Sequence, residues 1–434
     1  MLKVKWLSDA AALIAGSMLA FACGMPLGSE GPSIGVGGLI GEGVGKTAKK
    51  PLALRRYLIT GGSSAGLAVA FNAPLTGVAF ALEETHRRFS PGILLAALSA
   101  VVPAVLVSQL MFWGFSQNAY LYSLGMRQGA AVLPFLEQAG YASTLDMLKV
   151  CAAAAVVGVA TALAAVAFNL AIFSLGKLLK KIRMPGLRLM PAFLLTAVVG
   201  LSIGSAIGTG ESTLAHTSLD TAAWLIFTLF VVRMVMTATA SASGATGGLF
   251  LPMIAIGGLL GTLAAKTAVI CGVLPDYAPN IIMVCISAFF AASARAPISA
   301  IAMSVELTAS FANLLPCVIA VAVSTAVAAA FRCAPLYERM MEDLYAKAHT
   351  ARVGQNTVVT GAVFEQSIAC GKRIRDVLWP YNCLVTSLVR GETDIVPDGE
   401  TELLPGDILT VRAEDVVPQS FAEEMRDYII QNLQ

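Results

Sequence analysis

The 434-residue sequence predicts an all-α polytopic membrane protein with a small α+β domain at its C-terminal end. Hydrophobic residues make up 57% of the chain and charged residues only 13%, against about 25% charged residues in a typical soluble protein. Long apolar runs fill residues 1–346, whereas residues 352–434 have the charge density of a soluble domain. We therefore expect a membrane domain over 1–346 and a cytoplasmic domain over 352–434.

The composition also excludes several classes of protein. The formal net charge is only +2, and the sequence has no basic tract that could bind along the phosphate backbone of a nucleic acid. No nucleic-acid partner is therefore expected. The eight cysteines form no C-x-x-C pair and the three histidines are not at ligand spacing, so neither a metal site nor another cofactor is predicted. No H-E-x-x-H motif or nucleophile–base pair indicates an enzyme, and an intramembrane enzyme is the least favoured reading.

The apolar segments are irregular in length. They fall at about 9–27, 34–46, 57–82, 92–113, 148–176, 187–207, 221–240, 249–271, 279–308 and 312–331. Several are shorter than the roughly 20 helical residues that cross a bilayer, and glycine or proline interrupts others. Interrupted helices survive in a membrane where protein or a watery cavity satisfies the backbone. They are typical of transporters and channels with a site near the midplane.

Basic residues set the expected orientation. They cluster at 46–56, 86–88 and 177–188 and again around Arg332 and Arg339, while the loop at about 114–147 carries few charges. Under the positive-inside rule the basic loops and the C-terminal domain are cytoplasmic and the 114–147 loop is outside. No cleavable signal peptide is evident. We expect a multi-pass protein of the cell (inner) membrane, in contact with membrane lipid.

An internal repeat is visible in two pairs of motifs. They are APLT (73–76) with APIS (296–299), each followed by a glutamate, and GSEGP (28–32) with GGLFLP (247–252). The prolines of the first pair lie 223 positions apart and those of the second pair 220. Two near-equal offsets predict two repeats of tilted, broken helices, often of inverted topology in secondary transporters.

The two halves differ in what precedes the glycine-rich motif. About 95 residues (148–243) precede it in the second half, but only 27 residues precede Gly28. Projecting the second half onto the first predicts that this chain lacks about two long helices and a short one at its N-terminus.

The GSEGP motif carries the sharpest chemical signal. Its glycines let backbone N–H groups approach an ion, and the proline suits the first turn of a helix that we expect to begin near Ser33. A helix N-terminus binds anions, so the Glu30 carboxylate could occupy the anion site and leave it when protonated. A simple stabilisation of the helix dipole by Glu30 is equally compatible with the motif.

A second glycine-rich element, at 244–252, also leads into an apolar helix. It offers backbone N–H groups to the same midplane. Close helix–helix packing through small residues is its alternative role, but the pairing with GSEGP through the repeat favours an ion site.

Ionisable side chains in the apolar runs are few. Glu83 and Glu84 end one run, and intramembrane carboxylates mark ion or proton paths. Basic residues follow at once, so an ordinary cytoplasmic helix end is the alternative. Glu306 could be a structural cap or partner, and Arg233 and Arg295 are expected to be structural rather than ligands of a substrate.

Together these residues resemble a known family. The motifs are GSEGP (28–32), AGLAVAFNAPLTGVAFALEE (65–84), SGATGGLFLP (243–252), ARAPISAIAMSVELT (294–308) and PLY (335–337). In this order they resemble the CLC family of chloride channels and chloride/proton antiporters. The resemblance covers about residues 5–346 and implies a homodimer in which each subunit has its own anion pathway, built from inverted repeats.

The resemblance assigns two glutamates to gating and proton transfer. Glu30 is similar to the external gating glutamate, which competes with the anion and carries a proton. Glu84 is similar to the internal proton-transfer glutamate of the antiporters, which typical channels lack. Ser29 stands where the family often has a basic residue, so external attraction of anions is expected to be weaker.

The resemblance also implies the anion-binding residues. The backbone N–H groups of Leu249 and Phe250 would bind the central anion, the hydroxyl of Tyr337 would coordinate it from the cytoplasmic side, and Gly31 would contribute backbone to an outer site. The family's serine-bearing motif is absent from this sequence, in agreement with the repeat comparison.

Three functions stay open on the sequence. The pair Glu30 and Glu84 favours a chloride/proton antiporter. Its partners would be protons and chloride, with other halides as an alternative to chloride. A passive anion channel or fluoride exporter of the same family is the first alternative. A truncated, non-transporting regulatory subunit is the second.

The C-terminal domain is predicted to be β-rich. Alternating apolar and polar residues predict strands at 383–388 and 407–411, with turns at 397–399 and 405–407 and a helix over 421–432. The motifs at 371–376, 390–392 and 404–407 resemble the TrkA-C (RCK-C) regulatory domain of potassium-transport subunits, and the resemblance covers about 75 residues of 352–434. This implies a regulatory or dimerising module with an unknown small ligand, and a plain stabilising domain is the alternative.

Overall fold

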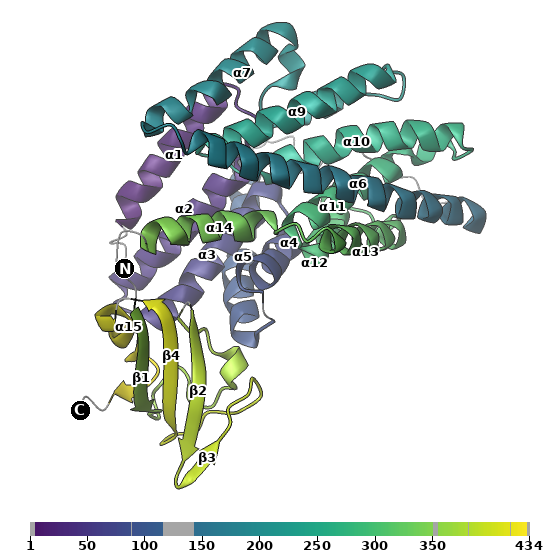
Figure 1. Ribbon diagram of the computed structural model, residues 1–434. Coiled ribbons are helices and arrows are strands. Elements are labelled where there is room, and N and C mark those ends of the chain that lie inside the picture. Colours follow the sequence, from purple (N-terminus) through teal and green to yellow (C-terminus); the bar gives the residue numbers. More distant parts are fainter. Residues whose placement is uncertain are drawn as a thin grey trace.

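A computed structural model describes residues 5–87, 89–115, 143–349, 355–380, 382–416 and 418–431. Helices pack together in one body and the strands form a second, smaller body beneath it (Figure 1). The predicted fold class, a polytopic helical protein with a small α+β domain, is confirmed. The loop assigned to the outside at 114–147 lies mostly beyond the described residues.

Fourteen helices of the described chain form the larger body. The first half contains α1 (Trp6–Ala22), α2 (Glu30–Thr47), α3 (Leu52–Phe71), α4 (Pro74–Phe80) and α5 (Pro91–Phe115). The second half contains α6 (Thr144–Leu179), α7 (Met190–Ser202), α8 (Glu211–Ala215), α9 (Ala223–Ser243), α10 (Phe250–Ile270), α11 (Ala278–Ala294), α12 (Pro297–Thr308), α13 (Leu314–Ala330) and α14 (Leu336–His349).

Several helix ends follow directly from local sequence. Pro74 and Pro297 stand at the first positions of α4 and α12, where a missing N–H costs nothing. Asn72 ends α3 in the left-handed conformation, with φ of 49°, and Gly244 ends α9 with φ of 85°. Asparagine and glycine tolerate this conformation better than other residues, so the chain can turn sharply there.

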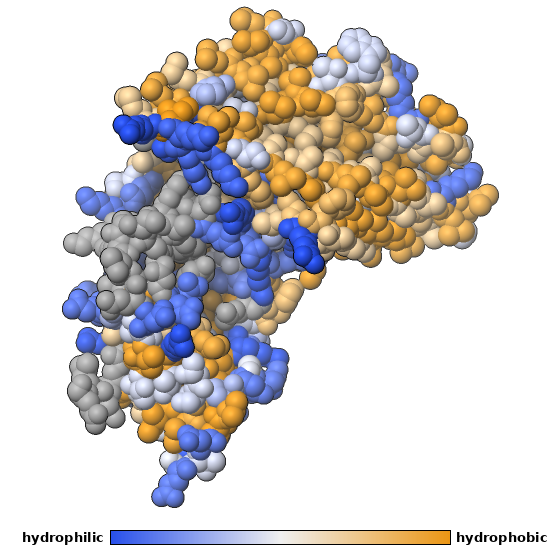
Figure 2. Space-filling view, in the orientation of Figure 1, coloured by the Kyte–Doolittle hydropathy of each residue, from blue (hydrophilic) through white to orange (hydrophobic). Residues whose placement is uncertain are grey.

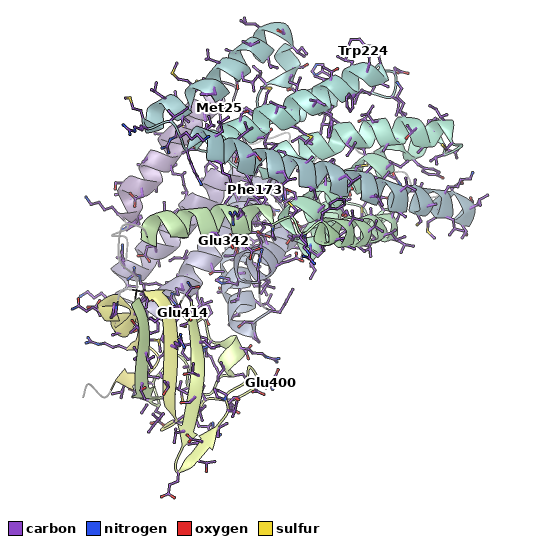
Figure 3. The ribbon with its side chains drawn as sticks, viewed as in Figure 1. Met25, Phe173, Trp224, Glu342, Glu400 and Glu414 are labelled. Atoms are coloured by element: carbon purple, nitrogen blue, oxygen red, sulfur yellow. The ribbon has the colours of Figure 1, made fainter. Side chains whose placement is uncertain are left out.

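The helical body has the surface of a membrane protein. Within the described chain, five segments are long and apolar enough to cross a bilayer: Pro91–Met111, Thr144–Leu179, Ala223–Ser243, Phe250–Ile270 and Pro275–Ala294. Figure 2 shows apolar residues over most of the visible helical surface, with polar groups gathered toward the strands. Trp224 is 71% exposed near the start of α9, at the far side from the strands (Figure 3), a position typical of the membrane–water interface.

The two halves repeat one packing scheme. Helix α2 packs on α3 as α10 packs on α11, and α3 packs on α5 as α11 packs on α13. Gly28 and Gly248, 220 positions apart, exchange both backbone hydrogen bonds at N···O distances of 2.8 and 2.7 Å. The repeat found in the sequence therefore brings its own glycine motifs into contact.

The smaller body is a five-stranded antiparallel sheet in the order β3-β2-β4-β1-β5. Its elements are β1 (Gln355–Ala362), β2 (Cys383–Arg390), β3 (Thr393–Ile395), β4 (Ile408–Val416), α15 (Pro418–Met425) and β5 (Ile430–Gln431). Buried side chains such as Leu388, Leu409 and Val411 line its core.

The helix predicted over 421–432 is wrong in its second half. Helix α15 ends at Met425, and the chain returns as β5 beside β1. Tyr428 and Ile429 are buried in the core of the sheet domain, and the Tyr428 hydroxyl donates to the Leu378 carbonyl at 2.6 Å. A continued helix would remove both side chains from that core, so burial overrides the helical pattern.

The sheet domain docks on the start of α3. The Ala53 N–H donates to the Asp427 carboxylate at 3.0 Å, and Arg56 forms an ion pair with Glu424 at 2.5 Å. Leu378 packs in the same apolar cluster as side chains of α4 and α5. The docking face of the helical body therefore includes part of the basic 46–56 segment.

Candidate anion and proton site

The glycine motifs bring Glu30 to the start of α10. Glu30 is the first residue of α2, so this helix begins three residues earlier than the expected Ser33. The side chain is only 2% exposed. A Cβ atom on Gly28 or Gly248 would collide with the Glu30 carboxylate, and these glycines therefore make room for it.

The Glu30 carboxylate accepts hydrogen bonds from the first turn of α10. Its Oε1 atom accepts from the N–H of Phe250 at 2.6 Å and from the N–H of Leu251 at 3.3 Å. Its Oε2 atom has no hydrogen-bond partner within the described residues. A helix N-terminus that holds a carboxylate in this way offers the same N–H groups to a free anion.

The predicted anion-binding residues lie close to this carboxylate. Phe250 contributes the N–H just described, and Leu249 is the buried residue that precedes α10. Gly31 packs so closely on the backbone of Gly248 that a side chain would not fit. The N–H of Leu251 was not among the predicted ligands, although its place in the same first helical turn is a signal that could have identified it.

Tyr337 approaches the site from α14. Its ring meets the ring of Phe80 edge-on, with centroids 6.0 Å apart and an interplanar angle of 85°. The Tyr337 ring thus lies beside the last residue of α4, the helix that leads into the turn carrying Glu84.

Glu84 occupies a single turn of π-helix, Ala81–Thr85, that continues α4. Its Oε2 atom is buried and has no hydrogen-bond partner within the described chain. A π-turn inserts one residue into a helix and is frequent at functional sites. The neighbouring Glu83, in the same turn, directs its carboxylate to the start of another helix.

Glu83 caps the start of α12. Its carboxylate accepts from the N–H of Ile298 at 2.9 Å, the N–H of Ser299 at 2.8 Å and the hydroxyl of Ser299 at 2.9 Å. These bonds satisfy N–H groups that a helix start leaves free. Glu83 therefore has a structural role as a helix cap, whereas Glu84 has one oxygen without a hydrogen-bond partner among the described residues.

Glu306 makes the equivalent cap in the other half. It accepts from the N–H groups of Leu75 and Thr76 at 2.6 and 2.8 Å and from the Thr76 hydroxyl at 2.6 Å. Glu306 lies in α12 and caps α4, and Glu83 directly follows α4 and caps α12. The structural role expected for Glu306 is thus confirmed, and the repeat shows the same carboxylate clamp twice.

The two buried arginines also contact backbone. Arg233 is 0% exposed and donates to the carbonyls of Ala206 and Gly208 at 3.0 and 2.8 Å. Arg295 donates to the Ala328 carbonyl at 2.7 Å. Their expected structural role is confirmed. In the described parts of the chain no group of three or more metal-ligating side chains forms a cluster.

Comparison with known proteins decides the family. The family model described as "Voltage gated chloride channel" matches residues 2–329. The chain belongs to this family. A second model, the TrkA-C domain, matches residues 362–423 of this family member.

Relatives of this family member include proteins named as exchangers. It is 28% identical over 367 residues to the H(+)/Cl(-) exchange transporter ClcA of Salmonella paratyphi A, covering 81% of this chain and 72% of that protein. It is 29% identical over 355 residues to ClcA of Klebsiella pneumoniae subsp. pneumoniae, covering 79% of this chain and 71% of that protein.

Solved structures show the same fold. A slow cyanobacterial Cl-/H+ antiporter aligns with a TM-score of 0.67 and 26% identity, covering 80% of this chain and 78% of that one. A CLC-type fluoride/proton antiporter aligns with a TM-score of 0.54 and 22% identity, covering 70% and 71% of the two chains. The second likeness concerns the fold alone.

Proposed function

We propose that this protein exchanges chloride for protons across the membrane. The observation that carries the proposal is the Glu30 carboxylate held by the N–H groups of Phe250 and Leu251. A negatively charged side chain already occupies a site suited to a small anion. Its relatives named as H(+)/Cl(-) exchangers support the choice of ions.

The exchange follows from competition for one site. When Glu30 is ionised, its carboxylate holds the N–H groups at the start of α10 and excludes chloride. When Glu30 takes up a proton, its attraction to these donors falls and chloride can replace it. The return of the carboxylate expels chloride and releases the proton, so the two ions move in opposite directions.

Glu84 is proposed to exchange the proton with the cytoplasm. Its buried, unpaired oxygen can accept a proton without breaking a structural hydrogen bond. Glu83, whose carboxylate caps α12, could not do so without loosening that helix. The phenol of Tyr337, whose ring packs edge-on against Phe80 at the end of α4, is proposed to coordinate the anion.

We propose an inner-membrane location with the sheet domain in the cytoplasm. The docking of that domain beside Arg56 places it on the same side as the basic 46–56 segment, which the positive-inside rule assigns to the cytoplasm. The TrkA-C domain is proposed to regulate transport through an unidentified small ligand.

The family resemblance further suggests a homodimer. Apolar exposed side chains such as Leu75 and Ile298 lie at the starts of α4 and α12. Cross-linking of single cysteines introduced at these two positions, in a background without native cysteines, tests the assembly. A dimer linked through either position supports the proposal, and exclusively monomeric protein contradicts it.

The transport proposal is tested with purified full-length protein in proteoliposomes. An imposed chloride gradient should drive protons uphill, and the Glu30→Gln variant should abolish this movement. Chloride flux without protons would instead indicate a passive channel. Folded protein without any flux would contradict transport by this chain.

A further inference from the structure

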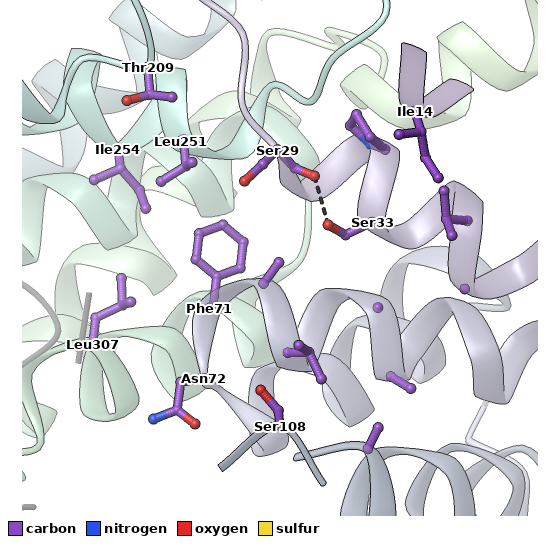
Figure 4. Close-up of a pocket in the computed structure, with 18 of the residues that line it drawn as sticks. Ile14, Ser29, Ser33, Phe71, Asn72, Ser108, Thr209, Leu251, Ile254 and Leu307 are labelled. Carbon is purple, nitrogen blue, oxygen red and sulfur yellow. Dashed lines mark hydrogen bonds between the residues drawn. The ribbon is translucent and has the colours of Figure 1, made fainter. Parts of the chain in front are cut away.

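A cavity of about 620 Å³ lies beside the proposed gate, between α2, α3, α5 and the start of α10. Figure 4 shows Phe71 projecting into its centre, with Ser29 and Thr209 on the side toward Leu251. Its volume is within the range of pockets that hold drug-sized ligands. Most of the wall is apolar, because glycine, alanine, valine and isoleucine residues supply it.

Among the described residues that line this cavity, one side chain is ionisable. Glu211, the first residue of α8, is half-buried in its wall. The Glu211 carboxylate has neither a hydrogen bond nor an ion pair anywhere in the described chain. A cation is the electrostatic complement of a half-buried carboxylate in a largely apolar wall.

The cavity wall is continuous with the residues that hold Glu30. Ser29 and Leu251 both line the cavity; Ser29 precedes Glu30 in the chain, and the Leu251 N–H donates to its carboxylate. The ring of Phe71 stacks on that of Phe250, with centroids 4.4 Å apart. An occupant in contact with these side chains would oppose the movement that releases Glu30.

We propose that this cavity binds a free amphiphile with a single apolar chain and a cationic amine head. The chain fills the apolar space around Phe71 and the head pairs with Glu211. The bound molecule holds the start of α10 in place and thereby slows ion exchange. Only this effect on exchange rests on the proposed function, because binding itself does not require transport.

The first test measures binding to the full-length protein by native mass spectrometry. The probes are decyltrimethylammonium, n-decanol and n-decanoate, which share a ten-carbon chain and differ in head charge. We expect the cationic probe to bind about tenfold more tightly than the alcohol, as one partly desolvated ion pair would give. Decanoate should bind least, because its charge repels that of Glu211.

Matched variants locate the binding site. Glu211→Gln should remove the tenfold preference for the cation, whereas Asp220→Asn, which removes an exposed carboxylate beyond the cavity, should keep it. Ala65→Leu should fill part of the cavity and weaken all three probes. If Ala65→Leu does not fold, Ala104→Leu on the facing helix α5 serves the same purpose.

Three results would overturn the proposal. They are equal affinities for the three probes, a cation preference that survives Glu211→Gln, and a co-purified phospholipid or polypeptide helix that the cationic probe cannot displace. Equal affinities would assign the cavity to a neutral occupant, a surviving preference would place the cationic head away from Glu211, and an undisplaced lipid or helix would identify a much larger occupant.

The second test measures exchange. Decyltrimethylammonium carries no transferable proton, so it cannot itself collapse a pH gradient. It should slow chloride-driven proton movement in the wild-type protein and in Asp220→Asn but leave Glu211→Gln unaffected. Inhibition of Glu211→Gln equal to that of the wild type would contradict the gating effect. A wild type without exchange would refute the proposed function and leave the binding result standing.

Discussion

Glu83 and Glu306 cap each other's helices across the two halves of the molecule. Glu83 accepts three hydrogen bonds at the start of the helix that carries Glu306, and Glu306 accepts three at the start of the helix that leads to Glu83. This reciprocal clamp fixes the turn that carries Glu84. Glu84 takes no part in the clamp and keeps a buried oxygen without a hydrogen-bond partner among the described residues, as the proposed proton transfer requires.

Loss of one cap should destabilise the membrane domain. Glu306→Ala leaves the N–H groups of Leu75 and Thr76 without their partner, at a cost of about 2 kcal/mol in the free energy of unfolding. Thermal unfolding in detergent should show a lower midpoint. Glu338→Ala, which removes the partner of Arg87 in an exposed ion pair, should change the midpoint far less. Equal midpoints for both variants would contradict the clamp.

Adjacent glutamates should respond differently to the same change. Glu84→Gln should stop proton movement but retain chloride flux and stability, because the carboxylate has a buried, unpaired oxygen. Glu83→Gln should lower stability and leave coupling in the folded fraction, because this carboxylate caps α12. Parallel flux and unfolding measurements separate the two roles. If Glu84→Gln lost both its chloride flux and its stability, Glu84 would have a structural role instead.

Neutralisation of the gate should remove the pH dependence of chloride flux. Protonation of Glu30 frees the donors of α10, so wild-type chloride flux should rise as the pH falls. In Glu30→Gln the side chain is neutral at every pH, and the flux should stay nearly constant. Measurements of chloride efflux at pH values from about 4.5 to about 7.5 check this prediction. A variant that keeps the wild-type pH profile would exclude Glu30 as the gate.

The sheet domain should lose stability in acid through Asp407. Burial opposes the charge of Asp407, but bonds from Arg390 and the Leu404 N–H, with the charge of Arg390, hold the pKa of Asp407 below its ordinary value of 3.8. A carboxyl group whose pKa is lower in the folded state stabilises the fold above its unfolded pKa. That stabilisation disappears as the pH falls through the folded pKa.

Asp407→Asn should therefore cost about 1–2 kcal/mol at pH 7 and little in strong acid. The lower part of the range reflects solvent screening, since Arg390 is 38% exposed. Hydrogen exchange of β2 and β4 amides in the full-length protein measures the domain's opening free energy. Asp394→Asn, at an exposed position of β3, is the control. The effect of Asp407→Asn is compared at pH 7 and below about pH 3, which is about one unit under the ordinary pKa of an aspartate. Equal effects at the two pH values would contradict the ion-pair account.

The sequence predicted the part of the site that depends on special residue types. Glycine is needed where backbone meets the Glu30 carboxylate, and the GSEGP and GGLFLP motifs predicted that both segments serve an ion site at the same midplane. The direct contact between Gly28 and Gly248 was not predicted. The equal offsets of the repeats predicted corresponding positions. They did not reveal that Glu83 and Glu306 cap across the halves.

Features that arise from tertiary packing could not be read in this way. A π-turn of five residues has an apolar pattern too short to distinguish from an α-helical turn, so the separation of Glu83 from Glu84 was not predicted. The pattern over 421–432 continued a helix, but burial of Tyr428 and Ile429 ends it at Met425. The cavity at Glu211 lies between helices far apart in sequence.

The most direct test of the account is proton movement driven by chloride in proteoliposomes that contain the full-length protein. Chloride at higher concentration outside the vesicles than inside, with no initial pH difference, should drive protons out of the vesicles and thereby build up a pH gradient. Glu30→Gln should abolish this proton movement while chloride still moves. Chloride flux in the wild-type protein without any proton movement would contradict the claim that Glu30 couples the two ions.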